Sequence, residues 1–193
     1  MKKDSIIINA LILFGITIIA GFLLGLTYTA TEEPRAYQTK LKTEIALNTV
    51  LKNSKFIEEE ISGEPKFITK IYQGNSEEDG SGDVLGYAFQ LETLEGYGDV
   101  IKIMVGFKTD GTISGIDIVS HSETPGLGAK ADESKFKNQF ISKEISLLTV
   151  KKGATDPQDI DAIGGATITS AAVTNAVNEA IDYYNSNIKK EGN

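Results

Sequence analysis

The feature that most constrains this chain is an uncharged apolar run near its N-terminus, Ile6–Leu26. Its 21 residues would span about 31 Å as a helix at ~1.5 Å per residue, close to the ~30 Å hydrocarbon core of a membrane. A cleaved signal peptide has a shorter apolar region, about 7–15 residues, and ends in an A-x-A-like site. Here Tyr28 occupies the −3 position before Ala30. We therefore predict a retained transmembrane helix over residues 6–28.

Charges on either side of this run bear on its orientation. Lys2 and Lys3 precede it, and Glu32 and Glu33 follow it, which places a short N-terminus of residues 1–5 in the cytoplasm by the positive-inside rule. Three basic residues lie a little further along: Arg35, Lys40 and Lys42. A count over about fifteen residues is nearly balanced, so charge alone favours this orientation only weakly.

The absence of Cys and the single His narrow the chemistry open to this chain. The 193 residues fit one compact domain with appendages. Without Cys there is no ligand set for an iron–sulfur cluster or a thiolate zinc site, and we expect no metal site. His121 is the sole imidazole, and a lone His is more often structural than catalytic. We therefore predict no catalytic residue.

The charge balance and the missing sequence motifs argue against several further functions. The formal net charge of −8 argues against nucleic-acid binding, which depends on clustered Lys and Arg. Acidic residues concentrate in Phe56–Asp99, which we interpret as a solvated acidic face. The sequence carries no P-loop, no Ser-His-Asp arrangement and no G-x-G-x-x-G fingerprint. Hydrolysis and direct NADH binding are therefore not favoured.

The pattern of apolar residues beyond the first helix predicts an α+β domain with an antiparallel sheet and packed helices. Helix formers dominate up to Glu60, so we predict a helical connector over residues 29–64 and a folded domain over residues 65–190. Strands are expected at Lys66–Gln73, Val84–Glu92, Val100–Lys108, Ile113–Val119 and Leu147–Val150. Helices are expected at Ala131–Ile141 and from near Ser170 onward. Asp110-Gly111 between two strands is a hairpin signal.

The segment DAIGGATITS, Asp161–Ser170, places a Thr hydroxyl just ahead of an apolar helix face. Thr167 follows two glycines, which let a backbone approach a ligand closely. A helix start also presents free N–H groups and a partial positive charge to an anion. Thr169 or Ser170 is the expected N-cap. The segment is thus an anion-cradling turn or an ordinary loop-to-helix junction.

A second segment, HSETPGLGAK, has the composition of a tight turn with extra features. Pro125-Gly126 favours the turn, because Pro fixes φ and Gly tolerates a positive φ. Thr124 can offer a hydroxyl to a polar ligand edge, and Leu127 can cover an aromatic face. Gly128 favours close approach of a ligand.

These two segments together resemble the FMN-binding domain family, over roughly Val84–Ile188. DAIGGATITS resembles its flavinylation motif, Asp-x-x-Ser/Thr-Gly-Ala-Thr, and HSETPGLGAK its Glu-Thr-Pro-Gly-Leu-Gly loop near the flavin. The match makes Asp161 the motif's acid and Thr167 the acceptor of a covalent FMN phosphoester, and it departs from the family at Gly164. The further cofactor-binding residues that the resemblance implies are Gly165, Ala166, Thr169 and Ser170 in the motif, and Glu123, Thr124, Gly126, Leu127 and Gly128 in the loop.

The whole plan is similar to that of the G subunits of the Rnf ion-translocating ferredoxin:NAD oxidoreductase complexes. This resemblance implies a subunit that relays electrons through covalent FMN and is not catalytic by itself. It further implies a single-pass protein of the inner membrane whose flavin domain is extracytoplasmic. It also implies as partners the other membrane and peripheral Rnf subunits, a flavin transferase and membrane lipid. The alternatives are the C subunit of the sodium-pumping NADH:quinone oxidoreductase, and a non-redox membrane-anchored binding module. The short segment between Leu26 and Val84 favours the Rnf family.

Overall fold

The computed structural model describes residues 3–77 and 82–189, and the chain divides into two compact units, residues 1–42 and 43–193. The first unit is formed by most of helix α1, Lys3–Val50, which continues through Pro34. Its most apolar window has a mean hydropathy of 2.6, and none of that window is buried. By length and composition this helix is able to cross a membrane.

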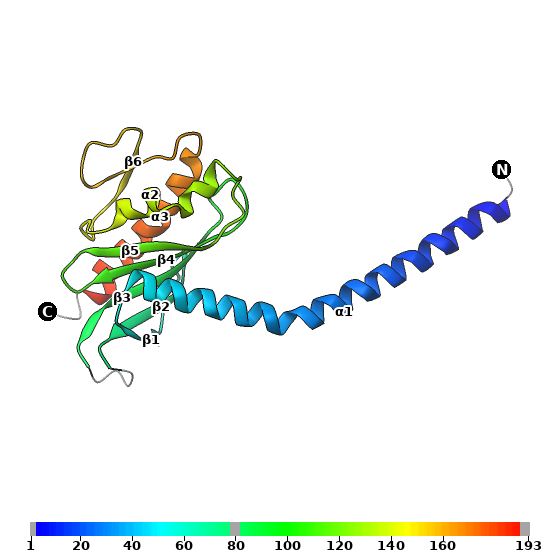
Figure 1. Cartoon of the computed structure of the whole chain (residues 1–193), viewed down its shortest axis with the longest axis horizontal. Helices are drawn as coiled ribbons and strands as arrows, with labels where there is room; N and C mark the ends of the chain where they lie inside the picture. Colours follow the sequence, from blue (N-terminus) through cyan, green and yellow to red (C-terminus); the bar gives the residue numbers. More distant parts are fainter. Residues whose placement is uncertain (1–2, 78–81, 190–193) are drawn as a thin grey trace. The chain divides into compact units, whose positions relative to one another are not determined.

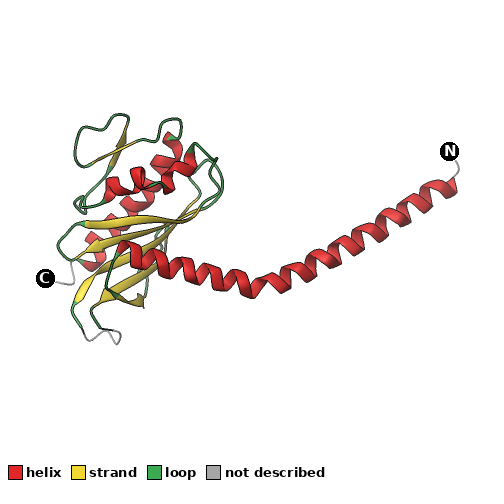
Figure 2. Cartoon of the chain, in the orientation of Figure 1, coloured by secondary structure: helices red, strands yellow, loops and turns green. Residues whose placement is uncertain are grey.

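The second unit is built on an antiparallel sheet of five strands in the order β1-β2-β3-β4-β5, drawn in yellow in Figure 2. The strands are β1 Lys55–Glu59, β2 Ile68–Asn75, β3 Val84–Thr93, β4 Ile101–Lys108 and β5 Ile113–Ser120. The hairpin at Asp110-Gly111 is confirmed, because the Lys108 N–H donates to the Thr112 carbonyl and Gly111 takes a φ of +87°.

Helix α3, Thr167–Tyr183, covers one face of this sheet (orange to red in Figure 1). Alternate residues of β3 and β4, including Phe89 and Ile103, point into a core that also contains Val173 and Val177 of α3. These side chains are fully buried, and each buried Val, Ile or Phe contributes about 1.5–3 kcal/mol. The α3 face therefore holds the main core of the unit.

The last two turns of α1 cover the opposite face of the sheet. Ala46, Leu47 and Val50 form a smaller core there with Tyr72 and Met104, among others. The backbone approach is close: a Cβ atom at residue 106, which is Gly, would lie 2.7 Å from the Val50 carbonyl oxygen. The end of the long helix is thus part of the folded domain.

The helical connector predicted over residues 29–64 is wrong in its last part. The helix ends at Val50, and Asn53 takes a left-handed φ of 58°, which Asn tolerates. The segment that follows pairs with β2 as strand β1, and Phe56 joins the smaller core. Tertiary pairing therefore overrides the helix preference of this acidic segment.

The segment between β5 and β6 is not the single continuous helix that the sequence predicted. The predicted helix at 131–141 is three short pieces, η1 Gly128–Asp132, α2 Ser134–Lys137 and η2 Asn138–Phe140. Phe136 and Phe140 still share one face, with ring centroids 5.5 Å apart. Strand β6, Thr149–Lys151, pairs in parallel with β7, Asp159–Asp161, and one π-helical turn, η3 Tyr184–Ile188, follows α3.

Candidate functional site

A pocket of about 530 Å³ lies at the N-terminal end of α3, within the usual range of ~300–1,000 Å³ for ligand sites. Four segments meet there: the turn after β3, the loop after β5, the β6–β7 loop and the start of α3. Its lining residues are Tyr97, Glu123, Thr124, Leu127, Gly128, Lys152, Gly165, Ala166, Thr167, Ile168 and Thr169. The pocket combines apolar side chains with hydroxyls, a carboxylate and a Lys.

The start of α3 is a helix end without a side-chain cap. The expectation that Thr169 or Ser170 caps a helix beginning near Ser170 is wrong, because the helix begins at Thr167 and its N-cap is Ala166. The first helical hydrogen bond is donated by the Ser170 N–H to the Ala166 carbonyl, at 3.1 Å. Within the described chain, the N–H groups of Thr167, Ile168 and Thr169 have no acceptor. A helix start of this kind is positive and ready to bind an anion.

Thr167 itself is exposed at this helix start. The turn before it is closed by the Ala166 N–H donating to the Ile163 carbonyl at 2.9 Å, and Gly165 takes a φ of +80°. A side chain at Gly164 would meet no atom within 4 Å. The hydroxyl residue usual in the family motif would therefore fit at this position.

Ser170 and Thr169 point inward. The Ser170 hydroxyl donates to the Ala166 carbonyl and accepts from the Ile163 N–H, both at 3.0 Å, and is fully buried. Ser170 thus stabilises the turn and is not among the pocket-lining residues of the described chain. The Thr169 hydroxyl donates to Glu123 Oε2 at 2.6 Å.

Glu123 is the polar centre of the site, with only 5% of its surface exposed. Its Oε1 accepts the N–H groups of Tyr97 at 2.9 Å and Gly98 at 3.0 Å. Burial raises the pKa of the Glu123 carboxyl, but hydrogen bonds from Thr169, Gly98 and Tyr97, together with the charge of His121, outweigh it, so the pKa is lowered. The carboxylate is therefore ionised at neutral pH.

Glycines leave the space that this carboxylate occupies. A Cβ atom at residue 128 would overlap Glu123 Oε2, and one at residue 96 would lie 2.5 Å from Oε1. Both positions are glycine in this chain. Gly128 therefore leaves room for the side chain of Glu123, and not for a ligand as the sequence suggested.

The Pro-Gly turn lies beside the pocket. The Thr124 carbonyl accepts the N–H groups of Leu127 at 3.1 Å and Ala129 at 3.2 Å, and Gly126 takes a φ of +78°, as a tight turn requires. Gly126 is exposed and is not among the pocket-lining residues that the structure describes. Its role is to turn the loop so that Leu127, which is 45% exposed, reaches the pocket.

Three lining residues were not predicted. Tyr97 and Ile168 are 76% and 58% exposed apolar side chains at the rim, and Lys152 comes from the β6–β7 loop. Tyr97 stands between two glycines in the segment Gly96–Asp99, a turn signal by which the sequence could have indicated it. No sequence signal marks Lys152, because the parallel pairing of β6 with β7 brings it to the pocket.

The acid of the first motif holds that loop. Asp161 Oδ1 accepts the Gly153 N–H at 2.7 Å, and the Ala162 N–H donates to the Lys151 carbonyl at 2.9 Å. These bonds tie the segment on either side of Lys152 to the strand that leads into Thr167. The exposed Asp161 therefore fixes the loop that carries Lys152 beside the helix start.

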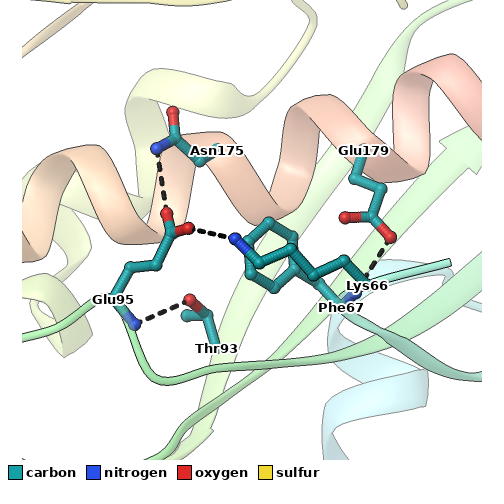
Figure 3. Close-up of polar contacts among 6 residues, drawn as sticks. All are labelled: Lys66, Phe67, Thr93, Glu95, Asn175 and Glu179. Carbon is teal, nitrogen blue, oxygen red and sulfur yellow. Dashed lines mark hydrogen bonds and ion pairs between the residues drawn. The ribbon is translucent and has the colours of Figure 1, made fainter.

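A cluster of polar contacts on the flank of α3 supports the turn after β3 (Figure 3). Glu95 accepts hydrogen bonds from Lys66 at 2.5 Å and from Asn175 of α3 at 3.1 Å. The Lys66 hydrogen bond is the main cause that lowers the pKa of Glu95. Further along the helix, Glu179 accepts the Phe67 N–H at 2.9 Å. The segment that carries Tyr97 is thus attached to α3 at a second point.

An uncapped helix start, an exposed hydroxyl and a mixed pocket are together suited to binding an anionic ligand. The family model for the FMN-binding domain matches residues 96–182, which include every lining residue of the pocket. No group of three or more metal-binding side chains occurs in the described residues.

Relatives match over nearly the whole chain. It is 34% identical to the G subunit of the proton-translocating ferredoxin:NAD(+) oxidoreductase complex of Clostridium ljungdahlii, over 85% of this chain and 83% of that protein. It is 35% identical to the G subunit of the Na(+)-translocating complex of Acetobacterium woodii, over 90% and 89%. The chain belongs to the family of G subunits of ion-translocating oxidoreductase complexes.

Two solved structures share the fold. NqrC of Shewanella oneidensis is 22% identical, with a TM-score of 0.51, over 61% of this chain and 58% of that one. The C subunit of the Na(+)-translocating NADH-quinone reductase from Parabacteroides distasonis is 23% identical, with a TM-score of 0.51, over 75% and 81%. The α+β fold predicted from the sequence is therefore confirmed.

Proposed function

We propose that this chain is a membrane-anchored electron carrier that holds FMN through a phosphoester on Thr167, within an ion-translocating ferredoxin:NAD oxidoreductase complex. The family model supports FMN as the cofactor. The relatives are named as subunits of such complexes, which supports the assembly. FMN, when bound, supplies the electron-transfer chemistry, and the protein's part is to position it.

The observation that carries covalent attachment is the uncapped start of α3. Thr167 presents an exposed hydroxyl beside three N–H groups that no described residue accepts from. A phosphate bonded to this oxygen would lie where the helix dipole and those N–H groups stabilise negative charge. The Lys152 side chain lines the same pocket and adds a positive charge.

The rest of the pocket fits the other parts of FMN. Leu127, Tyr97 and Ile168 provide exposed apolar surface for an aromatic ring system. Thr124 and Glu123 provide polar groups at the same wall. The pocket therefore has apolar cover and few but distinct polar groups, as flavin recognition requires.

Anchoring by α1 and an extracytoplasmic flavin domain complete the proposal. The helix has the length and composition to cross a membrane, which supports anchoring. The charges of Lys2 and Lys3 support a cytoplasmic N-terminus. Attachment of FMN also requires a flavin transferase as partner. Protection of the domain from protease in right-side-out vesicles would contradict this orientation.

A role as the C subunit of a sodium-pumping NADH:quinone oxidoreductase is the alternative. The two structural neighbours support it only at the level of the fold, at 22% and 23% identity. The sequence relatives at 34% and 35% identity span more than four fifths of both chains and are G subunits. The comparison therefore favours the ferredoxin:NAD complex.

The intact mass of the purified full chain tests attachment directly. Co-produced with a flavin transferase, the chain should gain the mass of FMN less one water, because the Thr167 oxygen replaces one phosphate oxygen. Thr167→Val keeps the side-chain shape and should abolish the gain. Thr149→Val, at an exposed Thr of β6, is the matched control and should keep it. A flavin mass on the Thr167→Val chain would refute the assignment of Thr167 as the acceptor. Absence of flavin on the unmutated chain would favour the alternative of a non-redox binding module.

A further inference from the structure

We propose that Glu123 is a positioning residue that also sets the reduction potential of the flavin, an inference that rests on the proposed function. It holds two walls of the pocket together, and its uncompensated negative charge lowers the potential. The acceptor Thr167 plays no part in this role, because it makes no hydrogen bond with Glu123.

The positioning role follows from where the partners of the carboxylate lie. Oε1 accepts from Tyr97 and Gly98 in the turn after β3, and Oε2 accepts from Thr169 in the first turn of α3. Glu123 itself belongs to the loop after β5. One side chain thus joins three segments that are distant in sequence and that all line the pocket.

The glycines around Glu123 show that this junction is closely packed. At Gly96 and Gly128 an added Cβ would lie within 2.5 Å of a carboxylate oxygen, closer than atoms can approach. Gly98 likewise leaves no room, because its Cβ would overlap the Ser122 carbonyl oxygen. The backbone therefore surrounds the carboxylate and fixes its place in the wall.

The charge of this carboxylate is not cancelled by its hydrogen-bond partners. All three donors are neutral: two backbone amides and one hydroxyl. Among the described residues, no Lys or Arg forms an ion pair with Glu123. Glu95, on the adjoining turn, is different, because its carboxylate is paired with Lys66 at 2.5 Å.

The pocket is small enough for this charge to act on any ligand within it. A sphere of 530 Å³ is about 10 Å across, which is about one Debye length at 0.1 M salt. Reduction adds negative charge to the flavin, and a fixed anion in the wall opposes that addition. Ionised Glu123 should therefore shift the reduction potential to more negative values.

Two other charged or titratable groups face the same region. Lys152 lines the pocket but is exposed, so water screens its charge more than that of the buried carboxylate. His121 accepts the Glu123 N–H at its Nδ1, at 3.2 Å, so it makes this contact as a neutral imidazole. Neither group is bonded to the carboxylate oxygens, so the buried carboxylate keeps its full negative charge in the pocket wall.

Glu123→Gln tests the effect on the potential. Gln keeps the shape and the carbonyl acceptor for Tyr97 and Gly98, and its amide can donate to Thr169, so the charge alone is lost. We expect the flavin-loaded full chain to shift to a more positive midpoint potential. Glu95→Gln, which removes a paired and partly exposed carboxylate nearby, is the control and should leave the potential unchanged. An unchanged potential in Glu123→Gln would overturn this role.

Hydrogen–deuterium exchange of the unmodified full chain tests the positioning role separately. Glu123→Ala removes the acceptor, so the amides of Tyr97 and Gly98 should exchange about tenfold faster or more, whereas Glu123→Gln should keep their protection. Unchanged protection in Glu123→Ala would overturn the positioning role. Absence of flavin on the unmutated chain would overturn the proposed function and with it the effect on the potential, but the exchange result would still decide the positioning role.

Discussion

At its C-terminal end, α3 packs Tyr183 against Phe89 and the following Tyr184 against Phe107, with ring centroids 6.2 and 5.5 Å apart, whereas no side chain caps its N-terminal end. One end is closed by aromatic contacts that continue into the sheet. The other end leaves N–H groups unbonded among the described residues and an exposed hydroxyl at Thr167. The C-terminal end of the helix is therefore packed into the core, whereas its first turn is held by the hydrogen bonds of Thr169 and Ser170.

The largest effect on folding should come from the aromatic end. Phe107→Ala removes a fully buried ring and should lower the free energy of unfolding by about 3–5 kcal/mol. Thr167→Val, at the exposed helix start, should change it by less than about 0.5 kcal/mol. Chemical denaturation of the full chain measures both. Similar losses of unfolding free energy in the two variants would show that the two ends of α3 contribute equally to stability.

A smaller effect is expected where the protein packs around Glu123. Gly128→Ala places a Cβ against both Glu123 Oε2 and Thr169 Oγ1, closer than van der Waals contact, and should cost about 1–3 kcal/mol of stability. Gly164→Ala is the matched control, since nothing lies within 4 Å of its added Cβ, and it should cost less than about 0.5 kcal/mol. Thermal unfolding separates them, and equal melting temperatures would show that the junction is loose.

The acid response should depend on the same junction. Because the folded-state pKa of Glu123 is lowered, its ionised form favours folding. This contribution is complete above the unfolded pKa, about 4.3, and is lost as the pH falls through the lower folded pKa. Glu123→Gln should therefore lose less stability on acidification than the unmutated chain. Glu95→Gln should show a smaller change, because the pKa of Glu95 is also lowered but solvent screens its partly exposed pair. Denaturation curves measured from neutral pH to below pH ~4.3 test this ranking of the two variants.

The smallest effect is expected at the departure from the family motif. Gly164→Ser restores a residue type usual in the family, in open space, and should leave both the melting temperature and the extent of flavin attachment unchanged. Intact mass and thermal unfolding measure the two quantities. A clear change in flavin attachment would mean that residue 164 contacts the phosphate or the transferase.

Much of the fold could be predicted because its signals are local. The strands β3, β4 and β5 lie where runs of Val, Ile, Phe and Tyr stand in the sequence, and the Asp-Gly hairpin lies at its dipeptide. Strand β4 is buried along nearly its whole length, because helices cover both faces of the sheet. Strand β1 could not be predicted, because its acidic segment is extended only through pairing with β2. At the site, the motif located Thr167, but the place of Lys152 depends on a parallel pairing with no local signal. Likewise, sequence spacing could not show that Ser170 points into its own turn.

The contact between the end of α1 and the sheet decides where this protein can be cut. Ala46, Leu47 and Val50 supply part of the smaller core, so a fragment beginning after Val50 would expose Tyr72 and Met104 to water. A fragment beginning between Leu26 and Thr43 would keep that core and lack the apolar run of the helix. Truncated and protease-released forms should therefore be soluble and folded only when the break falls upstream of this last part of the helix.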